Sequence, residues 1–312
     1  MRQHIADRWN KAFAGALLLC VALFNSAAAQ AQDIEPRQYT NVPVGMNFLI
    51  GGYTYTQGGV SFDPSLPVTK PDLETNSGVV GLSHSLDLWG KSSKVDAIVP
   101  FTWLSGTAQY NGEPASRSVS GFGDPLFRLS VNLYGAPALT LQELPAYEQD
   151  LVVGAALQVS APLGQYDGTR LVNIGANRWW FKPSLGASQA LGPWTLEATV
   201  AATFYTDNTD FYGGKTRAQD PIYSAQGHVI RSLSHGIWAS LSATYFAGGT
   251  TEIDGVDKAN LQRNWRVGGT LAFPVDRQNS VKLYASDGVS ARTGNSYTLF
   301  GVAWQYRWGG GL

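Results

Sequence analysis

Six charged residues lie in segments where apolar and polar residues alternate, and each falls on the more polar side of its segment. Charges removed from bulk water need partners, so a network of ion pairs inside the protein is the first expectation. A charged lining that discriminates among solutes is the sharper alternative, although simple packing of the interior would use the same residues. The six residues are Arg128, Lys182, Glu197, Arg266, Lys282 and Arg307.

Four aromatic residues share that polar side, namely Trp180, Tyr205, Trp238 and Tyr284. An aromatic ring offers a flat apolar face, so these side chains could line the path of a flat, apolar solute. They serve equally well as bulky filler of an interior. The sequence leaves both roles open.

A hydrolytic site is the third chemistry that the residues suggest. Beyond the N-terminal segment, histidine occurs at His84, His228 and His235. His84 lies between Ser83 and Ser85, but adjacent residues of a strand point to opposite faces, so neither serine can act with it. Attack on a lipid ester would require a serine from a neighbouring strand. We therefore predict no catalytic residue, and the scattered histidines predict no metal site.

The segment 1–31 has the features of a signal peptide. It starts with basic residues, continues with the apolar run 12–24 and ends in small residues that allow cleavage near Ala29 or Ala31. The apolar run is too short to cross a bilayer, which takes ~20 residues. Cys20, the only cysteine of the chain, leaves with this segment. The mature chain is therefore predicted to have no disulfide.

The charge balance of the mature chain is mildly acidic. The signal segment removes three basic residues and one acidic residue, which leaves 19 basic residues against 22 acidic ones. There is no basic stretch or arginine cluster, so nucleic acid is not an expected partner. The glycine-rich segment 121–124 lacks the lysine and the following helix of a phosphate-binding loop. No cofactor is expected.

Alternation of apolar and polar residues with a period of two predicts twelve β-strands. In the segment 194–206, for example, Leu196 and Val200 lie on one side, and Glu197 and Thr199 lie on the other. Most of these segments have ten to thirteen residues, close to the ~9–11 that cross a bilayer at a tilt. The predicted strands are 44–56, 76–88, 94–105, 125–134, 150–162, 177–189, 194–206, 221–233, 237–247, 262–274, 279–287 and 297–308.

Aromatic residues gather at both ends of these segments, as they do in the two interfacial belts of membrane barrels. Long polar loops also alternate with tight turns, except at residues 135–149, where a longer connection suggests a short helix. We therefore predict an all-β fold, a single antiparallel transmembrane β-barrel of about 12 strands. An even strand number places both termini on the periplasmic side.

The predicted organisation is a signal peptide at 1–31, a periplasmic segment at 32–43, a barrel at 44–308 and a short tail at 309–312. The polar segment 32–43 precedes the first strand, so it could fold back into the lumen as a plug.

Two segments carry a resemblance to a known family. They are 161–167 (Ala-Pro-Leu-Gly-Gln-Tyr-Asp) and 173–179 (Asn-Ile-Gly-Ala-Asn-Arg-Trp). With the segments 121–125, 248–250 and 304–308 they resemble the family described as "Putative MetA-pathway of phenol degradation". The resemblance implies an outer-membrane barrel of Gram-negative bacteria that is tied to the catabolism of aromatic compounds and described as a transporter. It brings no established catalytic residue.

These observations predict passive uptake of small hydrophobic or aromatic compounds across the cell outer membrane. A barrel of twelve strands is intermediate between the filled barrels of eight strands and the open channels of sixteen. A structural or adhesive barrel without a pore is the second hypothesis, and an outer-membrane lipid hydrolase is the third. The expected partners are outer-membrane lipid, the small apolar or aromatic solute and the barrel-insertion machinery.

Overall fold

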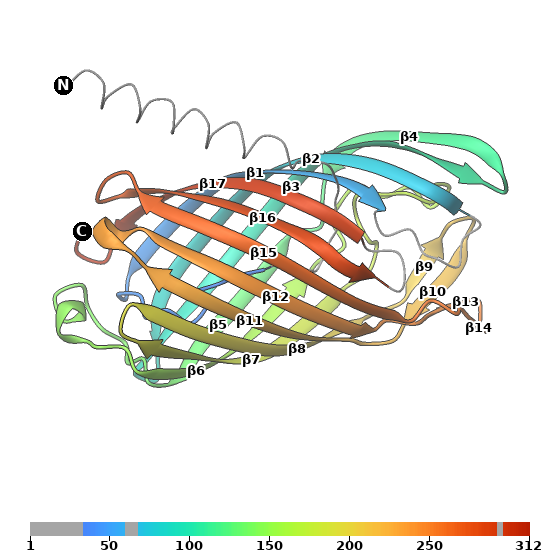
Figure 1. The fold of residues 1–312 in the computed structure, drawn as a ribbon. Helices are drawn as coiled ribbons and strands as arrows, with labels where there is room; N and C mark the ends of the chain where they lie inside the picture. The colour runs from blue at the N-terminus through green and yellow to red at the C-terminus, as the bar shows by residue number, and fades with distance from the viewer. Residues whose placement is uncertain (1–33, 60–67, 292–295) are drawn as a thin grey trace, which may run out of the picture.

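Neighbouring strands in the sequence pair with one another around a ring (Figure 1). The structure is a computed structural model that describes residues 34–59, 68–291 and 296–312. Within these residues, twelve strands close into an antiparallel β-barrel, because β1 pairs with both β2 and β17. The ring consists of β1 (Met46–Gly59), β2 (Val68–Leu88), β3 (Lys91–Tyr110), β5 (Leu126–Tyr134), β6 (Leu151–Ser160), β7 (Trp180–Leu191), β8 (Trp194–Tyr205), β11 (Ile222–Ser232), β12 (Trp238–Gly248), β15 (Gln262–Pro274), β16 (Asn279–Ala291) and β17 (Ser296–Gly309). The predicted signal peptide lies outside the described residues.

The predicted fold class is confirmed, and the side chains explain why the alternation marks a membrane barrel. Large apolar residues point away from the lumen and are exposed: Val80 is 58% exposed, Leu185 56% and Leu241 73%. Small polar residues fill the inner face instead, and Ser188 and Thr244 are completely buried. A water-soluble sandwich would show the reverse order, with apolar side chains inside. This distribution is the one expected where hydrocarbon surrounds the ring and water occupies its centre.

The start of β1 and the end of β17 lie at the same end of the barrel, because Met46 pairs with Gly309. The short connections also lie at this end, which we call the periplasmic end, and we call the opposite end the outer end. The longer connection 135–150 runs across the periplasmic end and contains one turn of 3-10 helix, η1 (Leu144–Ala146). A second such turn, η2 (Ser234–Gly236), joins β11 to β12. Among the described residues, no helix is both long enough and apolar enough to cross a membrane.

Several stretches predicted as loops form strands at the outer end, so this part of the prediction was wrong. β4 (Glu113–Phe122) pairs with the outer half of β3, outside the ring. A separate sheet contains β9 (Asn208–Phe211), β10 (Lys215–Gln219), β13 (Thr251–Ile253) and β14 (Val256–Asp257). These strands are not part of the closed ring, so neither of their faces must be apolar. They consequently lack the alternation on which the prediction depended.

Candidate functional site

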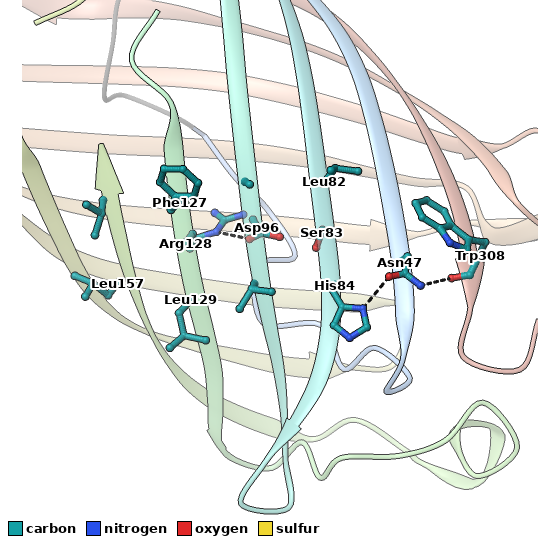
Figure 2. A pocket seen from close by; sticks show the side chains of 13 residues that line it. Asn47, Leu82, Ser83, His84, Asp96, Phe127, Arg128, Leu129, Leu157 and Trp308 are labelled. Carbon is teal, nitrogen blue, oxygen red and sulfur yellow. Dashed lines mark hydrogen bonds and ion pairs between the residues drawn. The ribbon is translucent and has the colours of Figure 1, made fainter. Parts of the chain in front are cut away.

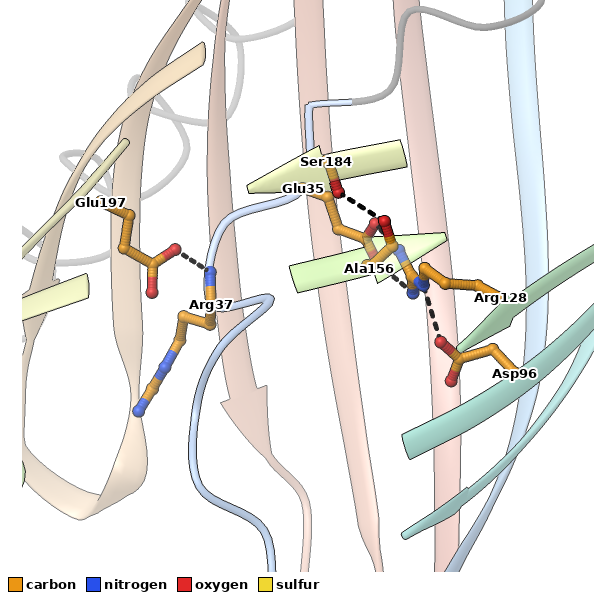
Figure 3. Close-up of polar contacts among 7 residues, drawn as sticks. All are labelled: Glu35, Arg37, Asp96, Arg128, Ala156, Ser184 and Glu197. Carbon is orange, nitrogen blue, oxygen red and sulfur yellow. Dashed lines mark hydrogen bonds and ion pairs between the residues drawn. The ribbon is translucent and has the colours of Figure 1, made fainter. Parts of the chain in front are cut away.

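Residues 34–45, which we call the lumen segment, run along the inside of the barrel wall before β1 begins (Figure 3). At the periplasmic end, the backbone N–H of Val44 donates to the carbonyl of Leu139 at 2.8 Å. The side-chain amide of Asn41 donates to the carbonyl of Pro137 at 3.1 Å. The connection 135–150 therefore holds the segment where it enters the barrel.

Arg128 joins the barrel wall to the lumen segment. It lies on β5 directly across from Asp96 on β3, and its Nε donates to Asp96 Oδ2 at 2.7 Å. Its Nη2 donates to Glu35 Oε1 at 2.8 Å, and its Nη1 pairs with the other oxygen of the same carboxylate. Burial of Glu35 opposes its ionisation, but the charge of Arg128 outweighs this effect and holds the pKa of Glu35 well below its usual range. One guanidinium thus serves two carboxylates (Figure 3).

Glu197 on β8 forms a second attachment of the lumen segment. Its Oε2 accepts a hydrogen bond from the backbone N–H of Arg37 at 2.6 Å, and its Oε1 accepts one from Ser188 Oγ at 3.0 Å. The guanidinium of Arg37 lies over the ring of Trp238, 5.3 Å from its centroid. Arg37 therefore contacts two residues predicted to face the interior: its backbone N–H binds Glu197, and its guanidinium makes a cation–π contact with Trp238.

Tyr39 anchors the lumen segment because its ring fits a depression in the barrel wall. Its side chain is fully buried, and its ring lies over two glycines of the wall, Gly154 on β6 and Gly186 on β7. These glycines pair with each other across the two strands. A Cβ atom on either one would clash with the ring. The adjacent glycines therefore create the depression that accepts Tyr39.

Substitution of Gly154 by valine is expected to expel Tyr39 from this depression. An overpacked site costs about 1–3 kcal/mol, and the ring can avoid that cost by leaving the wall. Trypsin should then cut after Arg37 several-fold faster than in the unmodified barrel, as followed by mass spectrometry of the intact chain. Gly227→Val is the matched control, because a Cβ at Gly227 meets nothing within 4 Å. Equal cleavage in the two variants would contradict the role of the depression.

The other predicted residues fall into separate groups. Arg266 is buried, with Nη2 donating to the carbonyl of Tyr297 at 2.8 Å and Nε to Ser286 Oγ at 3.1 Å. The ammonium of Lys282 lies 5.5 Å from the ring centroid of Tyr284 on the same face of β16. These two groups line the wall formed by β15, β16 and β17.

At the outer end, Trp180 pairs across strands with Tyr205, and the guanidinium of Arg178 lies 4.3 Å from the ring centroid of Tyr205. Lys182 follows on the same face of β7 as Trp180, across from Gln158. Arg307 is exposed at the periplasmic end, where its Nε donates to the carbonyl of Arg277 at 2.8 Å. These predicted residues are therefore not part of one cluster with Arg128.

Sequence reasoning missed the carboxylates that surround Arg128. Asp96 lies in a predicted strand on the polar face that it shares with Lys94, and this pairing of opposite charges at alternate positions was the available signal. The lumen segment was predicted as a possible plug, but nothing in its sequence indicates that Glu35 or Tyr39 contacts particular residues of the wall. Such contacts require the closed ring.

Asp124 holds the two family-like segments together at the outer end. It is buried, its Oδ1 accepts a hydrogen bond from the N–H of Gly164 at 2.8 Å, and its Oδ2 accepts one from the N–H of Ala176 at 2.7 Å. Burial raises the pKa of Asp124, and these backbone donors act in the opposite direction. The motif residues between β6 and β7 thus fold a loop that is fixed to the start of β5. This arrangement indicates that the motif residues shape and fix the loop.

Substitution of Asp124 by alanine should loosen this loop. The loss of two charge-assisted hydrogen bonds is expected to lower the free energy of loop opening by about 2 kcal/mol, which raises the open population roughly thirtyfold. Tryptic cleavage after Arg170, within the loop, should accelerate accordingly. Asp276→Ala is the matched control, because Asp276 accepts similar hydrogen bonds from Gln278 and Asn279 in a periplasmic turn. If Asp124→Ala is cleaved no faster than this control, Asp124 does not hold the loop closed.

An apolar groove of about 680 Å³ lies on the outside of the barrel and includes His84 (Figure 2). The Nδ1 atom of His84 is 2.8 Å from Asn47 Oδ1 on the neighbouring strand β1. On the other side, the residue of β3 paired with His84 is Val95. Among the described neighbours of His84 on this face, none supplies the serine that the hydrolase hypothesis requires.

A closed antiparallel ring with an apolar outside and a polar inside, whose first and last strands pair, defines a transmembrane β-barrel of the outer-membrane type. The chain belongs to the family described as "Putative MetA-pathway of phenol degradation", whose model matches residues 50–306. The resemblance noted in the sequence is thus confirmed.

Solved structures with the same fold support this class. An outer membrane channel from Pseudomonas putida F1 matches with a TM-score of 0.75 at 20% identity, covering 88% of this chain and 100% of that one. The transport unit of the autotransporter AIDA-I from Escherichia coli matches with a TM-score of 0.51 at 10% identity, over 95% of this chain and 98% of that one. No curated protein sequence matches this chain.

Proposed function

We propose that this protein is a passive channel for small hydrophobic or aromatic compounds in the outer membrane. The observation that carries the proposal is that the ring encloses enough space to hold an extended piece of polypeptide with its side chains, including the ring of Tyr39. A passage of that width suits a small aromatic molecule. The description of the family, which refers to phenol degradation, and the similar channel of Pseudomonas putida F1 support the same class of function.

The lining of the barrel offers contacts for such a solute. Trp180 and Tyr205 lie near the outer end, whereas Trp238 and Tyr284 lie on strands β12 and β16. Polar side chains occupy the wall between them. A phenol presents a flat apolar ring and one hydroxyl group, and this mixed surface would satisfy its two parts.

Swelling of proteoliposomes tests the proposal directly. Liposomes that contain the purified barrel should admit phenol-sized neutral solutes faster than liposomes without it, and larger sugars should be excluded. A strain that lacks the protein should take up aromatic compounds more slowly at low external concentration. Equal swelling with and without the protein, together with unchanged uptake of aromatic compounds in the strain that lacks it, would contradict the channel function.

A barrel without a pore is the second candidate, and the lumen segment favours it. The segment is attached through Glu35, Arg37 and Tyr39, which fill part of the interior. In that case the protein would act through its outer loops and the sheet formed by β9, β10, β13 and β14. Swelling experiments with the unmodified protein separate the two candidates, because only a channel admits solutes while the segment is in place.

A further inference from the structure

We propose that Arg128, with Lys94 and Lys282, forms a binding site for the carboxylate of a small aromatic acid, and that Glu35 occupies this site as an internal substitute. The inference rests on the proposed channel function and assigns a class of solute to it. The protein's own segment would thus compete with the anionic solute for the same guanidinium.

The charges around Glu35 are the first argument. Arg128, Lys94 and Lys282 all lie close enough to stabilise the negative charge of Glu35. Asp96 is the acidic residue of the wall that pairs with Arg128. Glu197 of β8 is a second wall carboxylate within electrostatic reach of Glu35. Three cations against two carboxylates leave the wall with one net positive charge when Glu35 is absent. A wall of this charge attracts an anion and would be costly to leave without one.

The mode of contact is the second argument. Both oxygens of Glu35 meet both terminal nitrogens of Arg128, while the remaining donor Nε is committed to Asp96. This two-pronged geometry is how a guanidinium recognises any planar carboxylate, whether it belongs to a side chain or to a free acid. Asp96 also holds the guanidinium in place, so the site remains formed if Glu35 departs.

The position of Glu35 makes exchange possible. It belongs to the lumen segment, which lies inside the barrel but is not one of its strands, whereas Arg128 and Asp96 are parts of the wall. The side chain of Glu35 is 37% accessible, compared with 10% for Arg128. The carboxylate can therefore be replaced without breaking any pairing between strands.

An aromatic surface lies next to one of the cations. Tyr284 follows Lys282 by two residues on the same face of β16. Its ring packs against Gly301 of β17, where a Cβ would clash with it. An aromatic side chain held against the wall beside this cation is a suitable partner for the ring of an aromatic acid.

Benzoate is the probe, and its binding to the purified barrel in detergent is measured by calorimetry. Removal of the competing carboxylate in Glu35→Ala is expected to strengthen benzoate binding about tenfold over the unmodified protein, because the internal substitute reduces the apparent affinity. Benzyl alcohol, the neutral analogue, should show no such gain. Glu148→Gln, which removes an exposed carboxylate at the periplasmic end, should leave benzoate binding unchanged.

The double variant Glu35→Ala with Arg128→Lys tests the guanidinium while it keeps the positive charge. It should lose most of the gained affinity, since an ammonium cannot make the two-pronged contact. Equal benzoate affinity in the unmodified protein and Glu35→Ala would overturn the proposal, as would an equal gain for benzyl alcohol. Benzoate binding without flux in liposomes would support the binding site and contradict the channel function. Flux without benzoate binding would support the channel function and contradict the binding site.

Discussion

Substitution of Arg128 by methionine is expected to lower the free energy of unfolding by about 3 kcal/mol, the lower end of the cost of an unpaired buried charge. The substitution leaves Asp96, which is 8% exposed, without the guanidinium that neutralises it. It also removes the partner of Glu35. The lower end applies because water in the lumen can partly solvate the remaining carboxylates.

The measurement is a urea titration of the barrel in detergent micelles, followed by the shift in gel migration that separates folded from unfolded barrels. The double variant Arg128→Met with Asp96→Asn should recover most of the loss, because it removes the more buried of the two carboxylates that lose their partner in the single variant. Arg277→Met serves as a control in an exposed periplasmic turn. If the single and the double variant are equally unstable, the ion pair is not the cause.

Deletion of residues 34–43 is expected to increase the single-channel conductance several-fold. The deletion removes Glu35, Arg37 and Tyr39 from the lumen and leaves the cross-section of the lumen to water and ions. It keeps Val44, so the contact with Leu139 at the start of the barrel remains. β1 and its pairings with β2 and β17 are untouched.

Planar-bilayer recordings provide the measurement. A variant in which residues 34–43 are replaced by an equal length of glycine and serine is the informative companion, since it retains the chain but loses the side-chain attachments of the segment, including that of Asn41. It should conduct nearly as well as the deletion if the attachments keep the segment in place. Unchanged conductance in both variants would show that the constriction lies elsewhere in the barrel.

The ring of strands was predictable because the membrane imposes a strict rule on each of its members. Residues such as Leu196 and Leu241 must face hydrocarbon, while the residues between them face water, so the period of two is visible in the sequence. The same rule placed Arg128 and Glu197 on the inner face. β4 was not predictable in this way, because it lies outside the ring and is free of the rule.

The contacts of the candidate site could not be predicted from the sequence in the same way. Arg128 meets Asp96 because β5 lies beside β3 in one particular register, which depends on β4 being left out of the ring. Glu35 reaches both only after the barrel has closed. The depression for Tyr39 needs Gly154 and Gly186 side by side, although 32 residues separate them in the chain. Each of these contacts depends on pairing between distant segments, which alternation does not specify.

The length of β2 and β3 has a consequence for the cell surface. These strands have 21 and 20 residues, about twice the ~9–11 that a bilayer requires. With β4 they continue as a ribbon that projects to one side of the outer end (Figure 1). Its tip, the tight turn at Asn111 and Gly112, is the part of this ribbon farthest from the ring. A large molecule that approaches this end would meet the tip before it reaches the mouth of the barrel.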